Sequence, residues 1–260
     1  MIRAAALALA FAFSTFAQAQ ASPASQPSGK FEPEVGQPGK DVVWVPTPQA
    51  VVDKMLDTAN VTPADFVMDL GSGDGRTVIT AARRGARALG IEYNADMVAL
   101  SKENADKAGV ASRAQFENAD LFKTDLTKAT VITMFLLPEI NKKLRPAILK
   151  LKPGTRVVSN TFTMGEWEPD ETFIVTPEQG CESSWCTVLF WIVPAQVAGN
   201  YKTAAGEFNL KQDFQMLIGT MRAGGRTVPV EGKVRGEEIT LTTGAKTWHG
   251  RKKGNSLELR

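Results

Sequence analysis

The chain has 260 residues, of which 43% are apolar and 22% are charged. This composition excludes a disordered chain, a collagen and a cysteine-rich scaffold. The length allows one large domain, or one domain with a small additional module. A formal net charge of +2 gives no overall field that would indicate a nucleic-acid partner. The charge is uneven, since residues 41–195 are net acidic and residues 196–260 are net basic, which predicts different roles for the two parts.

The first forty residues have the pattern of a targeting sequence followed by a linker. Residues 1–19 combine a basic start, a short apolar run and an Ala-Gln-Ala end, which is typical of a secretory signal peptide. An organellar transit peptide or an uncleaved anchor is the alternative, although the run is shorter than the roughly 20 residues that span a bilayer. Residues 20–40 are rich in Pro, Ser, Gly and Gln and predict a flexible linker. We therefore expect an exported, periplasmic protein.

Residues 41–194 alternate between strand and helix patterns. Short apolar runs predict strands at 66–70, 88–92, 115–118, 130–137 and 155–162. Apolar spacing and capping residues predict helices over 51–59, through 78–82, from 94 to 109 and from 138 to about 150. Two further strands, 172–176 and 187–193, have no helix between them and predict an antiparallel hairpin. The fold class is α/β, with a Rossmann-like parallel sheet covered by helices on both faces.

The pattern changes after Pro194. Residues 195–260 contain short alternating strands separated by Gly-containing turns, without helical spacing. We predict a small all-β accessory domain, either a meander or a partial barrel. Its basic end contains Arg251, Lys252 and Lys253, which could dock on an acidic partner or an anionic membrane surface, or simply protect a sheet edge. Few aromatic residues accompany these charges, so no nucleic-acid partner is expected.

The chemistry-bearing segment is the glycine turn after the first strand, Asp69-Leu-Gly-Ser-Gly-Asp-Gly-Arg76. Glycines at a strand-to-helix turn let a ligand approach the backbone closely. The turn differs from the dinucleotide fingerprint G-x-G-x-x-G, because the third glycine, Gly75, falls one position early. A dinucleotide oxidoreductase is therefore disfavoured.

Acidic residues on consecutive strands indicate the kind of ligand. Asp69 and Asp74 flank the glycine turn, where they would repel a diphosphate but suit a cationic ligand group. S-adenosylmethionine has an ammonium, a sulfonium and no phosphate. Glu92 ends the second strand and can accept hydrogen bonds from a ribose diol. Asp120 follows the third strand, where an adenine amino group would arrive. The alternative is that these residues are ordinary turn glycines and strand-end charges.

These motifs carry a family resemblance. Residues 42–193 resemble a class I S-adenosylmethionine-dependent methyltransferase, whose sheet has seven strands with an antiparallel terminal hairpin. Val45-Pro-Thr-Pro, Met68-Asp-Leu-Gly-Ser-Gly-Asp-Gly-Arg and Gly90-Ile-Glu-Tyr-Asn are similar to a protein-lysine methyltransferase family. Mitochondrial members of that family act on the ATP synthase c-subunit and the adenine nucleotide translocase. The resemblance implies S-adenosyl-L-methionine as the cofactor. It implies cofactor-binding roles for Asp69, Gly71, Ser72, Gly73, Asp74, Gly75, Glu92, Asn118, Asp120 and Leu121.

The methyl acceptor is expected beyond the end of the fourth strand. Phe135 and Pro138 are candidates for an apolar wall, and Glu139 is the candidate proton acceptor. A buried strand end with a proline at the first helical position explains the same residues without catalysis. Trp44 and Trp167 are candidates for the acceptor channel, because aromatic rings receive cationic side chains. Core or surface packing is the alternative for both.

The remaining reactive residues are few. Cys181 and Cys186 lie at the tip of the predicted hairpin, where a disulfide and two reduced thiols are both reasonable. The single histidine, His249, has no nearby Cys or Asp partner, so no metal site is expected. We predict a methyltransferase that acts on a protein lysine side chain. A small-molecule acceptor, or a non-catalytic adenosyl-binding module whose β domain recognises a partner, are the alternatives.

Overall fold

The structure is a computed structural model that describes residues 31–244 and 246–260. The predicted signal peptide and residues 20–30 of the predicted linker lie outside the described residues. Residues 36–44, the end of that linker and the segment after it, form a closed loop, because Gly36 and Trp44 are joined by a backbone hydrogen bond across it. In the described part of the chain, no helix combines the length and apolarity that crossing a membrane requires.

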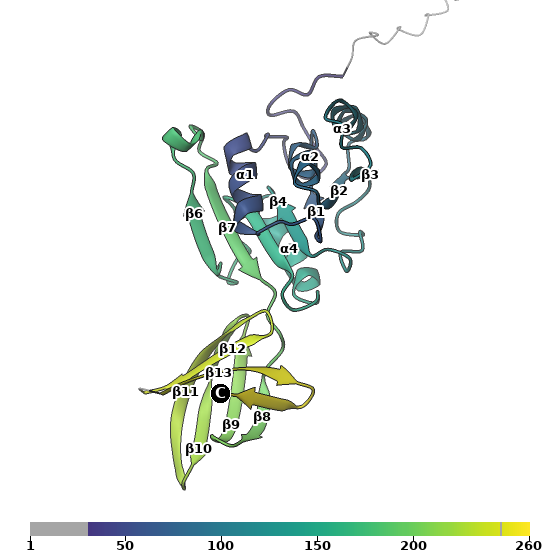
Figure 1. Ribbon diagram of the computed structural model, residues 1–260. Helices are drawn as coiled ribbons and strands as arrows, with labels where there is room; N and C mark the ends of the chain where they lie inside the picture. The colour runs from purple at the N-terminus through teal and green to yellow at the C-terminus, as the bar shows by residue number, and fades with distance from the viewer. Residues whose placement is uncertain (1–30, 245) are drawn as a thin grey trace, which may run out of the picture. The chain divides into compact units, whose positions relative to one another are not determined.

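Seven strands form the first sheet (Figure 1). In spatial order they are β3 (Ala114–Asn118), β2 (Arg87–Glu92), β1 (Phe66–Leu70), β4 (Val131–Met134), β5 (Arg156–Asn160), β7 (Thr187–Ile192) and β6 (Glu171–Ile174). The first five strands run parallel, whereas β7 is antiparallel to both β5 and β6. The predicted α/β sheet with its antiparallel terminal hairpin is confirmed. The strand order reverses between β1 and β4, and ligands of open parallel sheets bind outside the carboxyl ends at such a point.

The helices cover this sheet on both faces. They are α1 (Gln49–Thr58), α2 (Arg76–Arg83), α3 (Ala95–Lys107), α4 (Pro138–Ile148) and the short 3-10 helix η1 (Pro177–Gln179). Apolar residues of α1, α2 and α3 share one core with alternate strand residues such as Val67 and Val131. Residues of α4 share a second core with the intervening strand residues, among them Met68 and Ile132. The continuous apolar runs of β1 and β4 follow from burial on both faces.

Local signals explain where the elements near the site begin and end. The Asn94 side chain accepts hydrogen bonds from the backbone N–H groups of Asp96 and Met97, which caps α3 as predicted. Pro138 occupies the first turn of α4, where a missing N–H costs nothing. The fourth strand is shorter than predicted and ends at Met134, so residues 135–137 leave the sheet as a connection at its carboxyl edge.

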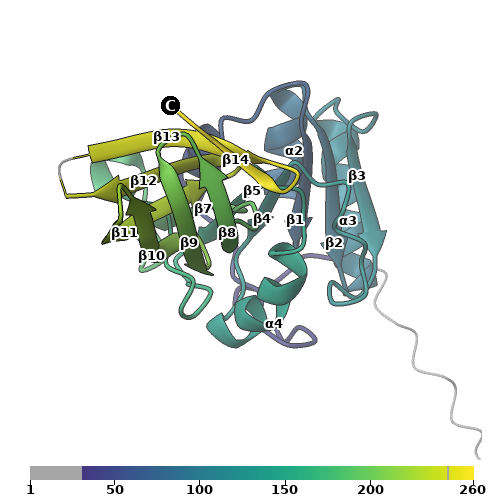
Figure 2. The same cartoon turned by 90° about the horizontal axis from the view of Figure 1, so that it is seen from below.

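Seven antiparallel strands form the second sheet, which is the predicted β module (Figure 2). They follow one another in chain order as β8 (Gly199–Thr203), β9 (Gly206–Asp213), β10 (Met216–Ala223), β11 (Arg226–Arg235), β12 (Glu238–Thr243), β13 (Lys246–Lys253) and β14 (Ser256–Leu259). The first and last strands contact each other, so the meander nearly closes into a barrel. Phe208 and Trp248 meet edge to face in its core, with ring centroids 5.7 Å apart. The module thus has a hydrophobic core of its own.

Candidate active site

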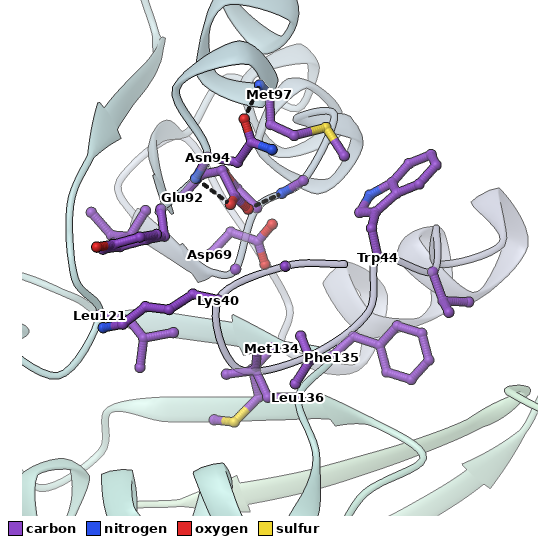
Figure 3. A pocket seen from close by; sticks show the side chains of 18 of the residues that line it. Lys40, Trp44, Asp69, Glu92, Asn94, Met97, Leu121, Met134, Phe135 and Leu136 are labelled. Atoms are coloured by element: carbon purple, nitrogen blue, oxygen red, sulfur yellow. Dashed lines mark hydrogen bonds between the residues drawn. The ribbon is translucent and has the colours of Figure 1, made fainter. Parts of the chain in front are cut away.

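A pocket lies at the carboxyl ends of β1, β2 and β4 (Figure 3). Its floor comes from the glycine turn after β1 and from the segments that follow β2, β3 and β4. The opposite wall is a strap (residues 37–47) that crosses the pocket. In Figure 3, Lys40 and Leu121 lie at one end of the pocket, Trp44 and Phe135 lie at the other, and Asp69 and Glu92 lie between them.

The glycine turn is closely packed because its glycines have no side chain. Gly71, Gly73 and Gly75 all have positive φ angles, of 77°, 53° and 84°. A Cβ atom on Gly73 would lie 2.6 Å from Nε1 of Trp44, and one on Gly71 would lie 2.9 Å from Cδ2 of Leu136. The turn therefore needs glycine both for its backbone conformation and for the close approach of the strap.

We expect Gly73→Ala to lower cofactor affinity at least about tenfold, because the new methyl group displaces Trp44 from the turn. Gly109→Ala is the matched control. Its φ of 69° imposes the same left-handed strain, roughly 1–2 kcal/mol, but a Cβ there meets nothing within 4 Å. Calorimetric titration with S-adenosylhomocysteine measures the affinity of both variants. Equal affinities would show that the turn tolerates a side chain.

Asp69 is the buried acid of the pocket. It is 6% exposed and accepts a hydrogen bond of 2.6 Å from Oγ1 of Thr133. Burial raises the pKa of Asp69 to about 7, and the nearby Glu92 carboxylate contributes in the same direction, while the Thr133 hydroxyl acts in the opposite direction. A carboxyl group held in this way gains most from a cationic ligand, which would stabilise its charged form.

The second acid of the turn, Asp74, forms an ion pair within the chain. Its carboxylate forms two-pronged contacts with Arg76, at 3.0 Å from Nε and 2.6 Å from an Nη atom. Arg76 also donates to the backbone carbonyl of Thr47 in the strap. Asp74 lines the pocket, as expected, but it is paired with Arg76, which ties the turn to the strap, whereas Asp69 has no cationic partner among the described residues.

Glu92 is held in place by the backbone. Its Oε2 accepts from the N–H of Gly73 at 3.0 Å, and its Oε1 accepts from the N–H of Asn94 at 2.9 Å. Each carboxylate oxygen has two lone pairs, so both can still accept from a ligand hydroxyl. This arrangement suits a ribose diol and links it to the glycine turn.

The end of the pocket near β3 is closed by the strap. The Lys40 ammonium lies 2.8 Å from Oδ2 of Asp120 and 4.6 Å from the centroid of the Tyr93 ring. The hydrogen bond from Lys40 holds the pKa of Asp120 below its usual range. Leu121 lines this end, whereas Asn118 is outside the lining and donates to the carbonyls at the end of β2. Of the three residues predicted to hold an adenine, Asp120 and Leu121 line this end of the pocket, and Asn118 lies outside its lining.

Only some of the residues predicted to contact the methyl acceptor line the pocket. Phe135 and Trp44 line the same end of the pocket. Pro138 and Glu139 are outside the lining, and the Glu139 side chain is exposed in an ion pair of 2.6 Å with Lys142. Trp167 is fully buried in the second core of the sheet, so its proposed place in the channel is wrong, and packing explains it.

Sequence reasoning missed part of the site. Trp44 and the Val45-Pro-Thr-Pro motif were singled out, but residues 37–40 of the strap read as a linker, and nothing in the sequence indicated that the segment crosses the pocket. Phe162 and Trp185 come from loops far apart in the chain, and both contact Phe135. Cys181 and Cys186, which flank the loop that contains Trp185, form a disulfide.

Comparison with known proteins identifies relatives of the Rossmann-like part. Residues 69–171 match the ANTKMT methyltransferase domain family. A protein-lysine N-methyltransferase from Saccharolobus islandicus is 45% identical over 137 residues, which cover 52% of this chain and 85% of that protein. An ATP synthase c-subunit lysine N-methyltransferase from Mus musculus is 36% identical, over 46% of this chain and 47% of its own length. The chain thus spans most of the archaeal relative but about half of the mouse one.

Among solved structures, an RNA methyltransferase from Salinibacter ruber in complex with S-adenosyl-L-homocysteine is similar in sequence and fold. It is 48% identical, with a TM-score of 0.54, over 59% of this chain and 96% of that one. The described pocket fits S-adenosylmethionine. The buried Asp69 suits its ammonium, Glu92 suits its ribose, and the buried hydroxyl of Ser72, which lines the pocket, has no hydrogen-bond partner of its own among the described residues.

Proposed function

The chain belongs to the family of protein-lysine N-methyltransferases to which the Saccharolobus islandicus enzyme belongs, and on this premise we propose that it methylates lysine side chains of a protein substrate. One observation carries the proposal. Asp69, the glycine turn, Glu92 and Asp120 lie along one pocket that ends at Trp44 and Phe135, with aromatic side chains where the acceptor would enter.

The residues of the chain bind and orient the cofactor and exclude water from it. When bound, S-adenosylmethionine supplies a methyl group on a positively charged sulfur, which is already a good leaving group. Asp69 and the turn hold the ammonium end, Glu92 holds the ribose and Asp120 holds the adenine. The strap excludes water from these contacts. Rate enhancement then comes from orientation and desolvation rather than from a covalent protein intermediate.

The acceptor amine has to lose a proton before its nitrogen can form the new bond to carbon. Asp69 is buried and committed to the cofactor, and Glu139 lies outside the pocket in its ion pair with Lys142. We infer that the proton leaves to water at the open end of the pocket. The positive charge of the bound cofactor lowers the pKa of the nearby acceptor amine, so water is a sufficient proton acceptor.

We therefore expect Glu139→Gln to change kcat by less than about twofold, since an exposed ion pair contributes roughly 0–1 kcal/mol and the carboxylate does not reach the pocket. The pH profile of kcat is the second readout, and it should be unchanged. A drop of about 100-fold, with loss of the acidic limb that a carboxylate base would give to the pH profile, would assign the proton transfer to Glu139 after all.

The substrate class is tested by comparing proteins from wild-type cells and from cells lacking this gene. Mass spectrometry should find lysines that lose the mass of one or more CH2 groups in the deletion strain. The names of relatives give the ATP synthase c-subunit and the adenine nucleotide translocase as their substrates, so protein acceptors are expected first. The similar Salinibacter ruber protein is called an RNA methyltransferase, so RNA is analysed in parallel. Marks lost only from RNA or from a small molecule would overturn the lysine assignment, and binding without transfer would support a non-catalytic module.

Location and docking are part of the same proposal. We propose that residues 1–19 direct export, that residues 41–194 form the methyltransferase domain and that residues 195–260 form a docking module. The disulfide between Cys181 and Cys186 supports an oxidising compartment such as the periplasm. The basic end of the module supports docking on an anionic lipid surface or an acidic partner, and sedimentation with anionic and neutral vesicles at two salt concentrations separates these outcomes.

A further inference from the structure

Three aromatic side chains form a cluster beside the cofactor pocket. The ring centroids of Phe135 and Phe162 are 5.8 Å apart and nearly parallel. The Trp185 ring lies 5.8 Å from Phe135 and 5.4 Å from Phe162, tilted against both. All three side chains are only half-buried. Because Phe135 also lines the pocket, this aromatic cluster (Phe135, Phe162 and Trp185) continues the pocket at its acceptor end.

The fold brings the cluster together at one edge of the sheet. Phe135 follows β4 and Phe162 follows the neighbouring β5, so both lie at carboxyl ends of adjacent parallel strands. Trp185 precedes β7, which runs antiparallel to β5 and therefore starts at the same edge. Three separate segments thus supply one ring each to the same place.

The backbone at Phe162 is held in an unusual conformation. Thr161 has a φ of 62°, which is rare for a β-branched residue. The N–H of Phe162 donates to the carbonyl of Asn160 at 2.7 Å, closing a three-residue turn. The carbonyl of Phe162 accepts from Oγ of Ser159 and from Nδ2 of Asn141. Such conformations persist only where surrounding bonds enforce them, and they gather at functional sites.

Trp185 depends on the disulfide for its position. The loop between Cys181 and Cys186 contains four residues, of which Glu182, Ser183 and Ser184 are exposed. Cys181 is 2% exposed and packs in the same core as α1, which anchors the loop. The N–H of Trp185 donates to Oγ of Ser183 within the loop. Cross-linking a short loop restricts its alternatives, so the bond keeps the indole over the two phenyl rings.

The cluster is free to receive a cation. Other aromatic rings of this protein, such as Tyr93, Phe122 and Phe173, already have a lysine of the chain over their faces. Across residues 31–244 and 246–260, no lysine or arginine lies over Phe135, Phe162 or Trp185. Three half-exposed rings beside an acidic pocket suit a lysine-like side chain. The faces of the rings attract its ammonium group, and their apolar surface packs against its alkyl chain.

We infer that Phe135, Phe162 and Trp185 form the binding site for the ammonium-bearing side chain of the acceptor, and that the Cys181–Cys186 disulfide is the positioning element that keeps Trp185 in it. The inference rests on the proposed function, because it names the residues that select a lysine-like acceptor. It also makes acceptor binding, but not cofactor binding, sensitive to reduction of this bond, since the disulfide lies outside the cofactor contacts.

The test is a titration of the full chain, loaded with S-adenosylhomocysteine, with two small probes. One probe is the amide of Nα-acetyl-trimethyl-lysine, and the other is its uncharged analogue with a tert-butyl group in place of the trimethylammonium. The wild type should bind the charged probe at least about threefold more tightly, as expected for a cation over aromatic rings. Trp185→Leu should abolish this preference, whereas Trp185→Phe should retain part of it.

Two further variants complete the test. Phe122→Leu removes a half-exposed ring outside the pocket and should keep the wild-type preference. Cys181→Ala/Cys186→Ala should behave like Trp185→Leu, and unchanged affinity for S-adenosylhomocysteine shows that each variant is folded. A wild type without charge preference, or a Trp185→Leu variant that keeps it, would overturn the aromatic site. A double cysteine variant that keeps it would overturn the role of the disulfide. None of these results depends on transfer to lysine, so failure of the proposed function is recognised separately.

Discussion

Asp69→Asn is expected to weaken binding of S-adenosylmethionine by about 100-fold or more, because a buried charge–charge contact contributes roughly 2–5 kcal/mol. The amide has nearly the shape of the carboxyl group and can keep the hydrogen bond from Thr133, so the substitution removes the negative charge and one acceptor oxygen with little change of shape. Calorimetric titration measures the affinity. A matched Asp125→Asn variant, which changes an exposed turn aspartate outside the pocket, should bind like the wild type.

Asp69→Asn weakens cofactor binding, but it should stabilise the ligand-free protein. The pKa of Asp69 is about 7 in the folded protein and ordinary in the unfolded chain. Between these two values the unfolded state holds fewer protons, so the stability of the ligand-free wild type falls as pH rises from about 4 to 7 and then levels off. Asp69→Asn removes this loss and should unfold at a higher temperature than the wild type at pH 8, with a smaller difference at pH 4. Equal pH dependence in both proteins would contradict the buried-acid interpretation.

Cofactor binding should also release protons. An ammonium beside Asp69 favours its carboxylate form, so binding well below pH 7 should expel most of one proton and binding well above pH 7 only a small fraction. The number follows from the enthalpy of binding measured in buffers with different ionisation enthalpies. Asp69→Asn should show no such difference between the two pH values.

Glu92→Gln is expected to weaken cofactor affinity by about 100-fold, with a smaller change in kcat. Glu92 accepts from the backbone N–H groups of Gly73 and Asn94 with its two oxygens. Glutamine has one acceptor oxygen and an NH2 group, so one of these N–H groups loses its acceptor and the ribose diol loses another. The substitution therefore disturbs both the ligand contact and the glycine turn.

The ribose contact can be isolated with a modified ligand. The wild type should prefer S-adenosylhomocysteine over its 2′-deoxy analogue, and Glu92→Gln should bind the two with similar affinity. Glu117→Gln is the control, since Glu117 is an exposed residue near the end of the neighbouring strand β3 and lies outside the pocket. If Glu92→Gln still discriminates between the two ligands, the ribose is held elsewhere.

The strands and helices of the α/β part follow from local patterns. Apolar runs bounded by turn residues locate all seven strands of the first sheet to within a few residues. The carboxyl ends of parallel strands meet at one edge, so motifs on consecutive strands predict a shared pocket. Asp69, Glu92, Asp120 and Leu121 do line one pocket for this reason. The fourth strand was predicted too long, because Phe135 to Leu137 continue its apolar run after it has left the sheet.

The remaining parts of the site depend on contacts between distant segments. Asp74 looked like a free carboxylate, and the structure pairs it with Arg76 two residues later, which apolar patterning does not reveal. The strap owes its place to a hydrogen bond between Gly36 and Trp44 and to the packing of Trp44 on Gly73. The sequence does not distinguish the roles of Trp167 and Trp185. The structure shows that Trp167 is buried in the core, whereas Trp185 lies in the disulfide loop beside the pocket.

Labelled methyl transfer is the most direct test of the proposed reaction. The purified full chain is incubated with methyl-labelled S-adenosylmethionine and an extract from cells that lack its gene, and the protein fraction is then hydrolysed to amino acids. We predict label in methylated lysine, and none with the Asp69→Asn variant. Label confined to RNA or to small molecules, or no transfer by a protein that binds the cofactor, would contradict the assignment.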